Sequence, residues 1–242
     1  MRNVFSFSGG KDSTAMVVDA FERGEDIADV VFFDTGWEFP AMAAHIAQVE
    51  EYIGRNITRL VPPQPFSHWM FDAVVRFRNG EQKGQQRRTG NGWPSPFRRW
   101  CTRIKVRCIN HYQKGLMQRA DIAHNMAVCI GYAADETERT ERTEHQANAE
   151  AHGWTVRYPL IERGMTEPQA LAFCKERGFD WGGCVRSFRP GFVLLLPAAR
   201  AQGTALASRS LSRPVAHHAG LGKAHGPDAA YPVQGRGQRA RS

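Results

Sequence analysis

Short apolar runs alternate with amphipathic segments up to about residue 183, and this alternation constrains the fold more than any other feature. Apolar runs at residues 4–7, 30–33 and 127–130 predict buried strands. Each run is followed by polar residues and then by a segment with helical spacing. Parallel strands need crossover connections, and helices usually supply them. The sequence therefore predicts an α/β fold, with a parallel twisted, Rossmann-like sheet and helices on both faces.

Weaker patterns complete this prediction. Residues 57–61 and 156–160 are expected to be extended, and residues 79–99, rich in Gly, Arg and Gln, are expected to form a long loop. The segment 40–52 begins with proline and has Gly54 after its end, as helices often do. Thr166, Glu167 and Pro168 are typical of a helix start. Helices are predicted at residues 14–23, 40–52, 66–78, 101–119, 143–152 and 166–177.

The net charge of +8 is unevenly distributed along the chain. Residues 1–184 contain 23 basic and 23 acidic residues, whereas residues 185–242 contain nine basic residues and one acidic residue, Asp228. The second segment has no Ile, Met or Trp and no periodic pattern, so it buries too little apolar surface to offset its ordering entropy. We expect a nucleotide-binding α/β domain at residues 1–184 and a basic, disordered tail at residues 185–242.

The five cysteines are odd in number and form no CxxC pair, which argues against a disulfide scaffold. A reducing, cytoplasmic compartment is the simpler expectation. No apolar stretch approaches 18 residues and no secretory leader is visible, so no membrane association is expected.

One polar motif, Ser8-Gly9-Gly10-Lys11-Asp12-Ser13, lies between the first predicted strand and helix. Glycines let a phosphate chain approach the backbone, and a following helix directs free N–H groups and its positive dipole end at the anion. The serine hydroxyls can donate hydrogen bonds, Lys11 can neutralise phosphate charge, and Asp12 can hold a divalent cation. The spacing matches neither GxxxxGK[ST] nor GxGxxG.

This motif resembles the PP-loop of ATP pyrophosphatases, which belong to the adenine nucleotide alpha hydrolase-like superfamily. Within that superfamily, the chain is similar to phosphoadenosine phosphosulfate (PAPS) reductases and their relatives. Four further segments carry the resemblance, which covers about residues 3–183: DTGWEFP at 34–40, RWCT at 99–102 with Lys105-Val106, GYAADE at 131–136 with Arg139, and YPLI at 158–161 with the helix through Trp181.

The resemblance implies a site for an adenine nucleotide at the carboxyl ends of the strands. It implies nucleotide binding by the whole PP-loop and by Asp34, Thr35, Gly131, Asp135, Glu136 and Arg139. Lys11, Asp12, Arg99 and Lys105 are the candidate catalytic residues, and Arg98 is a further candidate for holding phosphate or sulfate. Mg²⁺ is expected with ATP, and its candidate ligands are Asp12 and Asp34.

Two departures from the family pattern concern cysteine. The chain lacks the Glu-Cys-Gly motif of PAPS reductases, and only Cys101 lies in the segment where iron–sulfur relatives carry paired cysteines. An iron–sulfur cluster is therefore possible but is not supported by the cysteines present. Cys101 is a candidate reactive thiol because Arg98, Arg99 and Arg103 would favour its thiolate. Cys129 and Cys174 are expected to be buried structural thiols.

A further departure concerns the tail. Relatives are expected to carry a cysteine cluster where this chain has VLLLP at 193–197, and one codon choice for VLLLP gives Cys-x-Cys-Cys-Pro when read one base later. A single-base frameshift near residues 183–191 is a hypothesis that the gene sequence tests directly.

The intact SGGKDS favours cleavage of ATP between its α- and β-phosphates, with the adenylyl group passed to an acceptor, in a sulfur-transfer role. The acceptor, a nucleic acid or a sulfur compound, and the oligomeric state stay open. Reduction of PAPS or of adenosine phosphosulfate (APS) to sulfite is the alternative enzyme hypothesis. Nucleic-acid binding through the arginine-rich tail is the alternative from another class.

Overall fold

The computed structural model describes residues 1–95, 97–123, 125–136 and 144–183. Five parallel strands form the central sheet in the order β3-β2-β1-β6-β7, which confirms the predicted α/β class. The elements follow one another in this order: β1 (Arg2–Phe7), α1 (Lys11–Glu22), β2 (Ile27–Phe33), α2 (Pro40–Tyr52), β3 (Thr58–Leu60), the π-helical turn η1 (His68–Asp72), β4 (Val74–Arg76), β5 (Gln86–Thr89), α3 (Trp100–Leu116), β6 (Met126–Ile130), α5 (Glu144–His152), β7 (Thr155–Arg157), α6 (Pro159–Glu162) and α7 (Glu167–Glu176).

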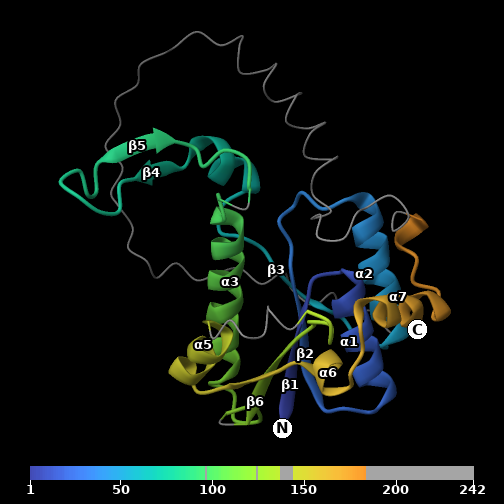
Figure 1. The fold of residues 1–242 in the computed structure, drawn as a ribbon. Helices are drawn as coiled ribbons and strands as arrows, with labels where there is room; N and C mark the ends of the chain where they lie inside the picture. The colour runs from blue at the N-terminus through green and yellow to red at the C-terminus, as the bar shows by residue number, and fades with distance from the viewer. Residues whose placement is uncertain (96, 124, 137–143, 184–242) are drawn as a thin grey trace, which may run out of the picture.

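The two faces of the sheet bury different residues, because successive side chains of a strand point in opposite directions. Phe5, Phe7 and Phe32 pack with residues of α1, α2 and α7. Val4 and Val31 pack on the other face, with residues of α3 and α5. The two helical layers lie on opposite sides of the sheet in Figure 1. The prediction that helices cover both faces is thus confirmed.

The predicted helix starts agree closely with the structure in two cases. Helix α2 begins at Pro40 and ends at Tyr52, as the proline and the following glycine indicated. Helix α7 begins after Thr166, which forms a capping box with Gln169. Helix α1 starts at Lys11, three residues earlier than predicted, so the second half of the PP-loop is already helical.

Residues 66–99 differ from the prediction. The expected helix at 66–78 is only the short turn η1, followed by β4, and the expected loop at 79–99 contains β5. Strands β4 and β5 pair antiparallel as a separate hairpin that projects beyond the start of α3 (Figure 1). The predicted strand 156–160 is likewise shorter, because Pro159 begins α6.

Residues 184–242 lie outside the described part of the chain, so the predicted boundary near residue 184 and the predicted tail stay predictions. Arg139 and Cys184 also lie outside it. Among the described helices, none combines the length and apolar character needed to cross a membrane.

Candidate functional site

The PP-loop turns sharply between β1 and α1, and its first glycine makes the turn possible. Gly9 has a φ of +75°, a backbone conformation that residues with a side chain rarely adopt. A Cβ at Gly9 would lie 2.2 Å from the sulfur of Met42 in α2. Gly10 precedes α1 and offers no capping side chain, so the first-turn amides of the helix are left for another acceptor.

Hydrogen bonds between the two serines hold the loop closed. The amide of Ser8 donates to Oγ of Ser13 at 3.1 Å, and the two Oγ atoms are 3.0 Å apart. Oγ of Ser13 also donates to the carbonyl oxygen of Gly10 at 3.0 Å. Ser13 therefore supports the loop from inside, whereas Ser8 is exposed and has its hydroxyl at the surface of the turn.

Two aromatic residues support the loop from behind. Nε1 of Trp181 donates to the carbonyl oxygen of Gly9 at 2.7 Å. The Trp181 ring stacks on His45 with 4.6 Å between ring centroids, and Nε2 of His45 hydrogen bonds with Oγ1 of Thr14 at 2.9 Å. Burial lowers the pKa of His45 to about 4, so the ring is neutral near pH 7. His45 was not predicted as a site residue, because its only sequence signal is its place on the apolar face of α2.

The residue after β6 approaches the PP-loop directly. A Cβ at Gly131 would lie 3.1 Å from the backbone N and Cα of Ser13 and 3.2 Å from the carbonyl carbon of Asp12. These are backbone atoms of α1, which cannot move aside without shifting the helix. Gly131 thus lets the end of β6 pack against the start of α1.

Charged side chains gather at the start of α1. Nζ of Lys11 lies 3.0 Å from carboxylate oxygens of both Asp12 and Glu167. One oxygen each of Asp12, Glu136 and Glu167 lies within 4.8 Å of the others. Sequence reasoning did not predict Glu167 as a site residue, because it starts α7, far along the chain; its acidic first turn was read only as a cap.

The pKa shifts of this cluster follow from burial and pairing. Burial raises the pKa of Asp12, and the cation of Lys11 opposes that shift only in part. Burial lowers the pKa of Lys11, but hydrogen bonds and ion pairs with Asp12 and Glu167 outweigh it, and the net pKa lies above its ordinary value. Lys11 is therefore firmly protonated.

The residues after Gly131 connect the cluster to α7. Oδ1 of Asp135 accepts a hydrogen bond from the amide of Glu167 at 2.9 Å, at the first residue of α7. Oε2 of Glu136 accepts one from the amide of Ala133 at 3.4 Å. Asp135 thus has a structural partner, and Glu136 joins the acidic cluster.

The predicted residues after β2 form a second polar group. The amide of Gly36 donates to Oδ1 of Asp34 at 2.7 Å, and the hydroxyl of Thr35 donates to Oε1 of Glu38 at 2.8 Å. Asp34 is not part of the group of three carboxylates, those of Asp12, Glu136 and Glu167, that could hold a metal ion among the described residues. Burial raises the pKa of Glu38. Glu38 was not predicted as a site residue, although it belongs to the DTGWEFP segment.

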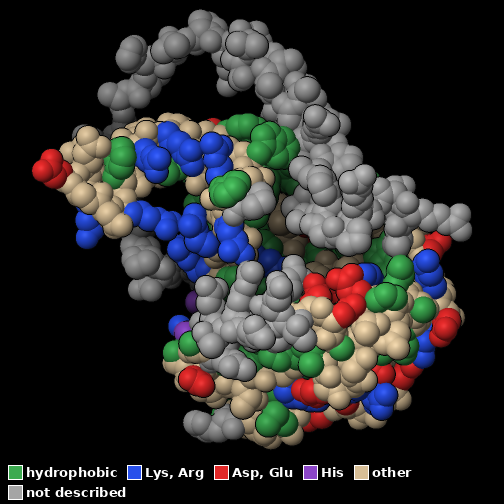
Figure 2. Space-filling view, viewed as in Figure 1, with side chains coloured by type: hydrophobic (Ala, Val, Ile, Leu, Met, Phe, Trp, Pro, Cys, Tyr) green, Lys and Arg blue, Asp and Glu red, His purple; other side chains and the backbone are tan. Residues whose placement is uncertain are grey.

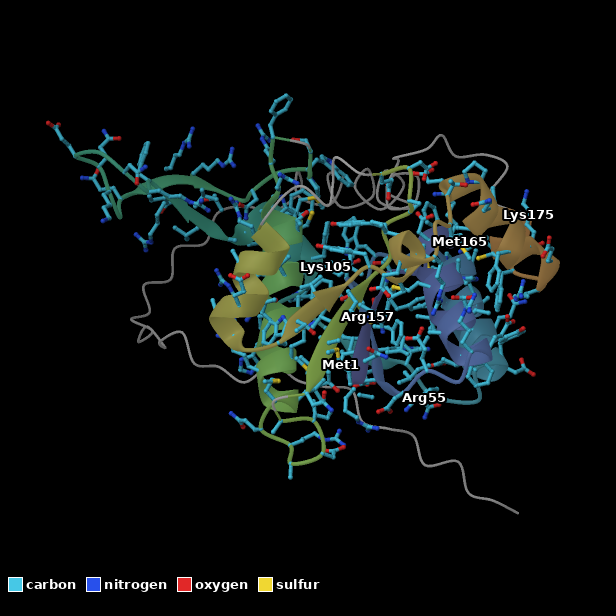
Figure 3. The ribbon with its side chains drawn as sticks, turned by 60° about the horizontal axis from the view of Figure 1, so that its bottom comes forward. Met1, Arg55, Lys105, Arg157, Met165 and Lys175 are labelled. Atoms are coloured by element: carbon cyan, nitrogen blue, oxygen red, sulfur yellow. The ribbon has the colours of Figure 1, made fainter. Side chains whose placement is uncertain are left out.

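Lys105 lies on the side of α3 that faces the sheet (Figure 3). Burial lowers its pKa, and the negative charges of Glu38 and Cys101 oppose this shift. Lys105 is thus electrostatically coupled to the group after β2. Arg98 and Arg99 are exposed at the start of α3, and neither lines the cavity described next.

A cavity of about 560 Å³ joins these elements at the carboxyl ends of β1 and β6, a volume suited to a small-molecule ligand. Its polar side is formed by PP-loop residues, Gly131 and Lys105. Asn110 and Gln113, further along α3, add amide groups that were not predicted. Its apolar side is formed by Val106, Ile109, Val128, Ile130, Trp154 and Val156.

The family model for the phosphoadenosine phosphosulfate reductase domain matches residues 2–157, from β1 through β7. This chain belongs to that family. The resemblance to the PP-loop superfamily is thereby confirmed. The matched range ends before α6, α7 and Trp181, although these contact the PP-loop side of the sheet.

A solved structure with a similar fold is that of the U34-tRNA thiolase NcsA from Methanococcus maripaludis with its [4Fe-4S] cluster. The TM-score is 0.45 at 12% sequence identity, and the match covers 87% of this chain and 66% of that chain. This chain thus spans slightly less than two thirds of that protein, and the likeness carries no argument about activity. No curated protein matches the chain.

The cysteines of this PAPS reductase family member do not come together among the described residues. Cys129 packs on the α1 face of the sheet, whereas Cys108 packs on the α3 face. Cys174 and Cys129 are buried, as expected, and burial raises the pKa of each thiol to about 12. Cys101 is half-buried, with its Sγ 4.0 Å from Oγ1 of Thr102. These four thiols do not fit an iron–sulfur cluster.

Proposed function

We propose that the protein binds ATP in the cavity beside the PP-loop and cleaves the bond between its α- and β-phosphates. The adenylyl group passes to an acceptor, which is thereby activated for sulfur transfer. The observation that carries this proposal is the arrangement around Ser8–Ser13: the uncapped start of α1, with Ser8 and Asp12, lines a cavity that also has an apolar side, and protonated Lys11 pairs with Asp12.

The chain's own residues supply positioning and charge. First-turn amides of α1 and the Ser8 hydroxyl would donate hydrogen bonds to phosphate oxygens. Lys11 would exchange its carboxylate partners for phosphate oxygens and neutralise their charge. The apolar side of the cavity, with Ile109 and Trp154, suits the flat face of adenine.

In the transfer step, a nucleophilic atom of the acceptor forms a bond to the α-phosphorus. The bond from the α-phosphorus to the bridging oxygen breaks, pyrophosphate leaves with the electron pair, and the acceptor's proton goes to solvent. Lys105 would stabilise negative charge that develops at the α-phosphate. Arg99 keeps its assignment as a catalytic candidate from the family motif.

The carboxylates of Asp12, Glu136 and Glu167 fit Mg²⁺, because this ion prefers oxygen ligands and their oxygens lie within 4.8 Å of one another. Bound Mg²⁺ would neutralise charge on the departing pyrophosphate. Asp12 keeps its role as first candidate ligand, whereas Asp34 lies outside this group and is the weaker candidate.

The family description favours one alternative, the reduction of PAPS or APS to sulfite. That reaction needs a nucleophilic thiol, and Cys101 is the half-buried cysteine among the described residues. For the sulfur-transfer hypothesis, a nucleic acid and a sulfur compound are the candidate acceptors.

Isothermal titration with ATP and Mg²⁺, and separately with PAPS, distinguishes the two activities. The proposal expects tighter binding of ATP, by at least tenfold, and loss of that binding in Lys11→Ala. Tighter binding of PAPS, unaffected by Lys11→Ala, would favour the reductase and remove the proposal.

A further inference from the structure

The exposed basic side chains gather on one part of the described chain. Residues 76–107 contain ten Lys and Arg and a single acidic residue, Glu81. We call the exposed members from Arg76 to Arg103 the basic face; they come from the β4–β5 hairpin and the start of α3. In Figure 2, Lys and Arg side chains form two bands there, while Asp and Glu gather elsewhere. The basic face consists of Arg76, Arg78, Lys83, Arg87, Arg88, Arg98, Arg99 and Arg103.

Carboxylates of the described residues do not compensate the charge of the basic face. Among the described residues, none of these eight side chains lies within ion-pair distance of a carboxylate. Arg76 donates instead to the carbonyl oxygen of Gly84 at 2.8 Å, and Arg87 lies over the ring of Phe77 at 5.6 Å. Eight like charges held together repel one another, so the surface is suited to a polyanion.

The hairpin is a fixed platform for this charge. Nε1 of Trp100, the first residue of α3, donates to the carbonyl oxygen of Gly92 at 3.0 Å. Trp100 also packs with Phe66, Met70 and Trp37 in a small buried cluster. The segment after β5 is therefore held against both α3 and the segment after β2.

Large aromatic side chains are exposed beside the arginines. Phe97 is 97% exposed and Trp93 is 39% exposed. The rings of Trp93 and Trp37 pack edge to face, with 6.3 Å between their centroids. Exposed rings next to arginines provide stacking surfaces for unpaired bases, and such stacking tolerates any sequence. At this exposure, Phe97 contributes little packing to the fold.

A groove of about 470 Å³ runs between the hairpin and α3. Its lining includes Arg76, Arg78, Arg87, Arg88 and Arg103, with the amide of Asn91 among them. A concave, arginine-lined groove admits a single strand, with its phosphates on the guanidinium groups. A flat bilayer surface cannot enter it, which favours nucleic acid over a lipid surface.

Helix α3 connects this groove with the nucleotide cavity. Arg103 lines the groove, whereas Lys105 and Val106 line the cavity. Residues two apart on a helix lie about 200° apart around its axis, so Arg103 and Lys105 point to opposite sides of α3. The groove and the nucleotide cavity therefore lie on either side of the first turns of α3. A strand in the groove that passes over the start of α3 would therefore come to the cavity where the α-phosphate is proposed to react.

We propose that the basic face binds a single-stranded segment of nucleic acid, which presents the acceptor to the nucleotide cavity. This names the acceptor class and rests on the proposed function. Phosphates would lie on the groove arginines, and bases would stack on Phe97 and Trp93. The residues of this surface are not those of the segment 185–242, through which the alternative hypothesis expected nucleic-acid binding.

Fluorescence anisotropy of the full chain with labelled 20-nucleotide single strands of RNA and of DNA, and with a duplex, tests the proposal. Phe97→Ala should weaken single-strand binding about tenfold, because one stacking contact is lost. The double variant Arg87→Gln/Arg88→Gln should weaken it about tenfold at 0.15 M salt and reduce the salt slope by about 1 to 2. The RNA and DNA arms identify which strand is preferred.

The matched control is Arg55→Gln/Lys175→Gln, which removes the same charge from exposed positions far from the hairpin (Figure 3). It should leave strand binding within twofold of wild type. Equal weakening by the control and the hairpin variants, or none by either hairpin variant, would overturn the proposal. Anionic vesicles that bind with the same dependence on Phe97 would also overturn it, in favour of a lipid surface.

ATP titration and pyrophosphate release, measured on the same variants, separate the two proposals. Phe97→Ala and Arg87→Gln/Arg88→Gln should keep wild-type affinity for ATP. Strand binding that depends on the basic face, without pyrophosphate release from ATP, would remove the proposed function and keep the nucleic-acid surface. Pyrophosphate release with strand binding unaffected by these variants would remove only the surface.

Discussion

Nε1 of Trp181 donates a hydrogen bond of 2.7 Å to the carbonyl oxygen of Gly9, which joins the last described turn of the chain to the PP-loop. Trp181 has a φ of 53°, uncommon for a residue with a side chain, so the chain adopts a strained turn to present the indole. Because Gly9 is itself in a left-handed conformation, the bond fixes the peptide at the tightest point of the loop.

Trp181→Phe tests this support. The variant keeps an aromatic ring against His45 but leaves the Gly9 carbonyl without its donor. We expect a loss of about 1–2 kcal/mol in the free energy of unfolding, measured with urea. ATP affinity, measured by titration, should fall about tenfold. Trp69→Phe is the matched control, because it removes an indole bond to the Gln64 carbonyl far from the loop. Equal ATP affinity in both variants would contradict the role of Trp181.

Gly131→Ala tests the close approach of β6 to α1. The added methyl would meet backbone atoms of Ser13 at 3.1 Å, so the start of α1 must shift. The free energy of unfolding should fall by about 1–3 kcal/mol, and ATP affinity should fall with it. Gly115→Ala, in α3 with nothing within 4 Å, should instead be neutral or stabilising by up to about 1 kcal/mol. Equal melting temperatures of Gly131→Ala and Gly115→Ala would contradict the close packing of β6 against α1.

Because burial lowers the pKa of His45, we expect the protein to lose stability in mild acid. This pKa is about 4 in the folded protein and 6.5 in the unfolded chain, so the unfolded state binds more protons between these values. This contribution is fully present above pH 6.5 and is lost as pH falls towards 4, by an amount on the order of 3 kcal/mol. Urea unfolding across this range should show a smaller decline in His45→Gln. In the control His111→Gln, at an exposed position of α3, the free energy of unfolding should fall with pH as it does in the wild type. A fall of the same size in His45→Gln would contradict this role of His45.

Lys105 predicts an alkaline limit to activity. Burial lowers its pKa below 10.5, so the side chain loses its charge at a lower pH than an exposed lysine. If the cation stabilises the reacting phosphate, the rate of pyrophosphate release should decline as pH rises through that pKa. Lys105→Arg should move the decline to higher pH, because a guanidinium keeps its proton. Lys114→Arg, exposed near the end of α3, should leave the profile unchanged. A profile that stays the same in Lys105→Arg would assign the decline to another group.

The middle of the central sheet could be predicted because β1, β2 and β6 each contain a short apolar run. Phe5 and Phe32 face one helical layer and Val4 and Val31 the other, so all these positions had to be apolar. The hairpin was missed for the opposite reason. Strand β5 reads QRRT and is exposed throughout, so burial imposed no alternation on it. The spacing of Phe66, Met70 and Val74 resembles that of a helix, although the chain turns at Ala73 into β4.

Site residues were predictable where they belong to a recognisable motif, as in the PP-loop and at Lys105, Gly131 and Glu136. The roles of Ser13 in closing the loop and of Lys11 beside Asp12 follow from one short motif. Glu167 and Trp181 come from segments more than 150 residues away, and their contacts with the loop depend on how α7 packs against α1. Lys105 was identified through the family motif, but its coupling to Glu38 requires α3 to pack beside the end of β2.

The central claim is that the PP-loop binds ATP and promotes its cleavage to pyrophosphate. The most direct measurement is pyrophosphate release from ATP and Mg²⁺ by the wild type and by Lys11→Ala and Asp12→Ala, in the presence of single-stranded nucleic acid. The account predicts release by the wild type and at least a hundredfold slower release by both variants. Equal rates in all three proteins would contradict it.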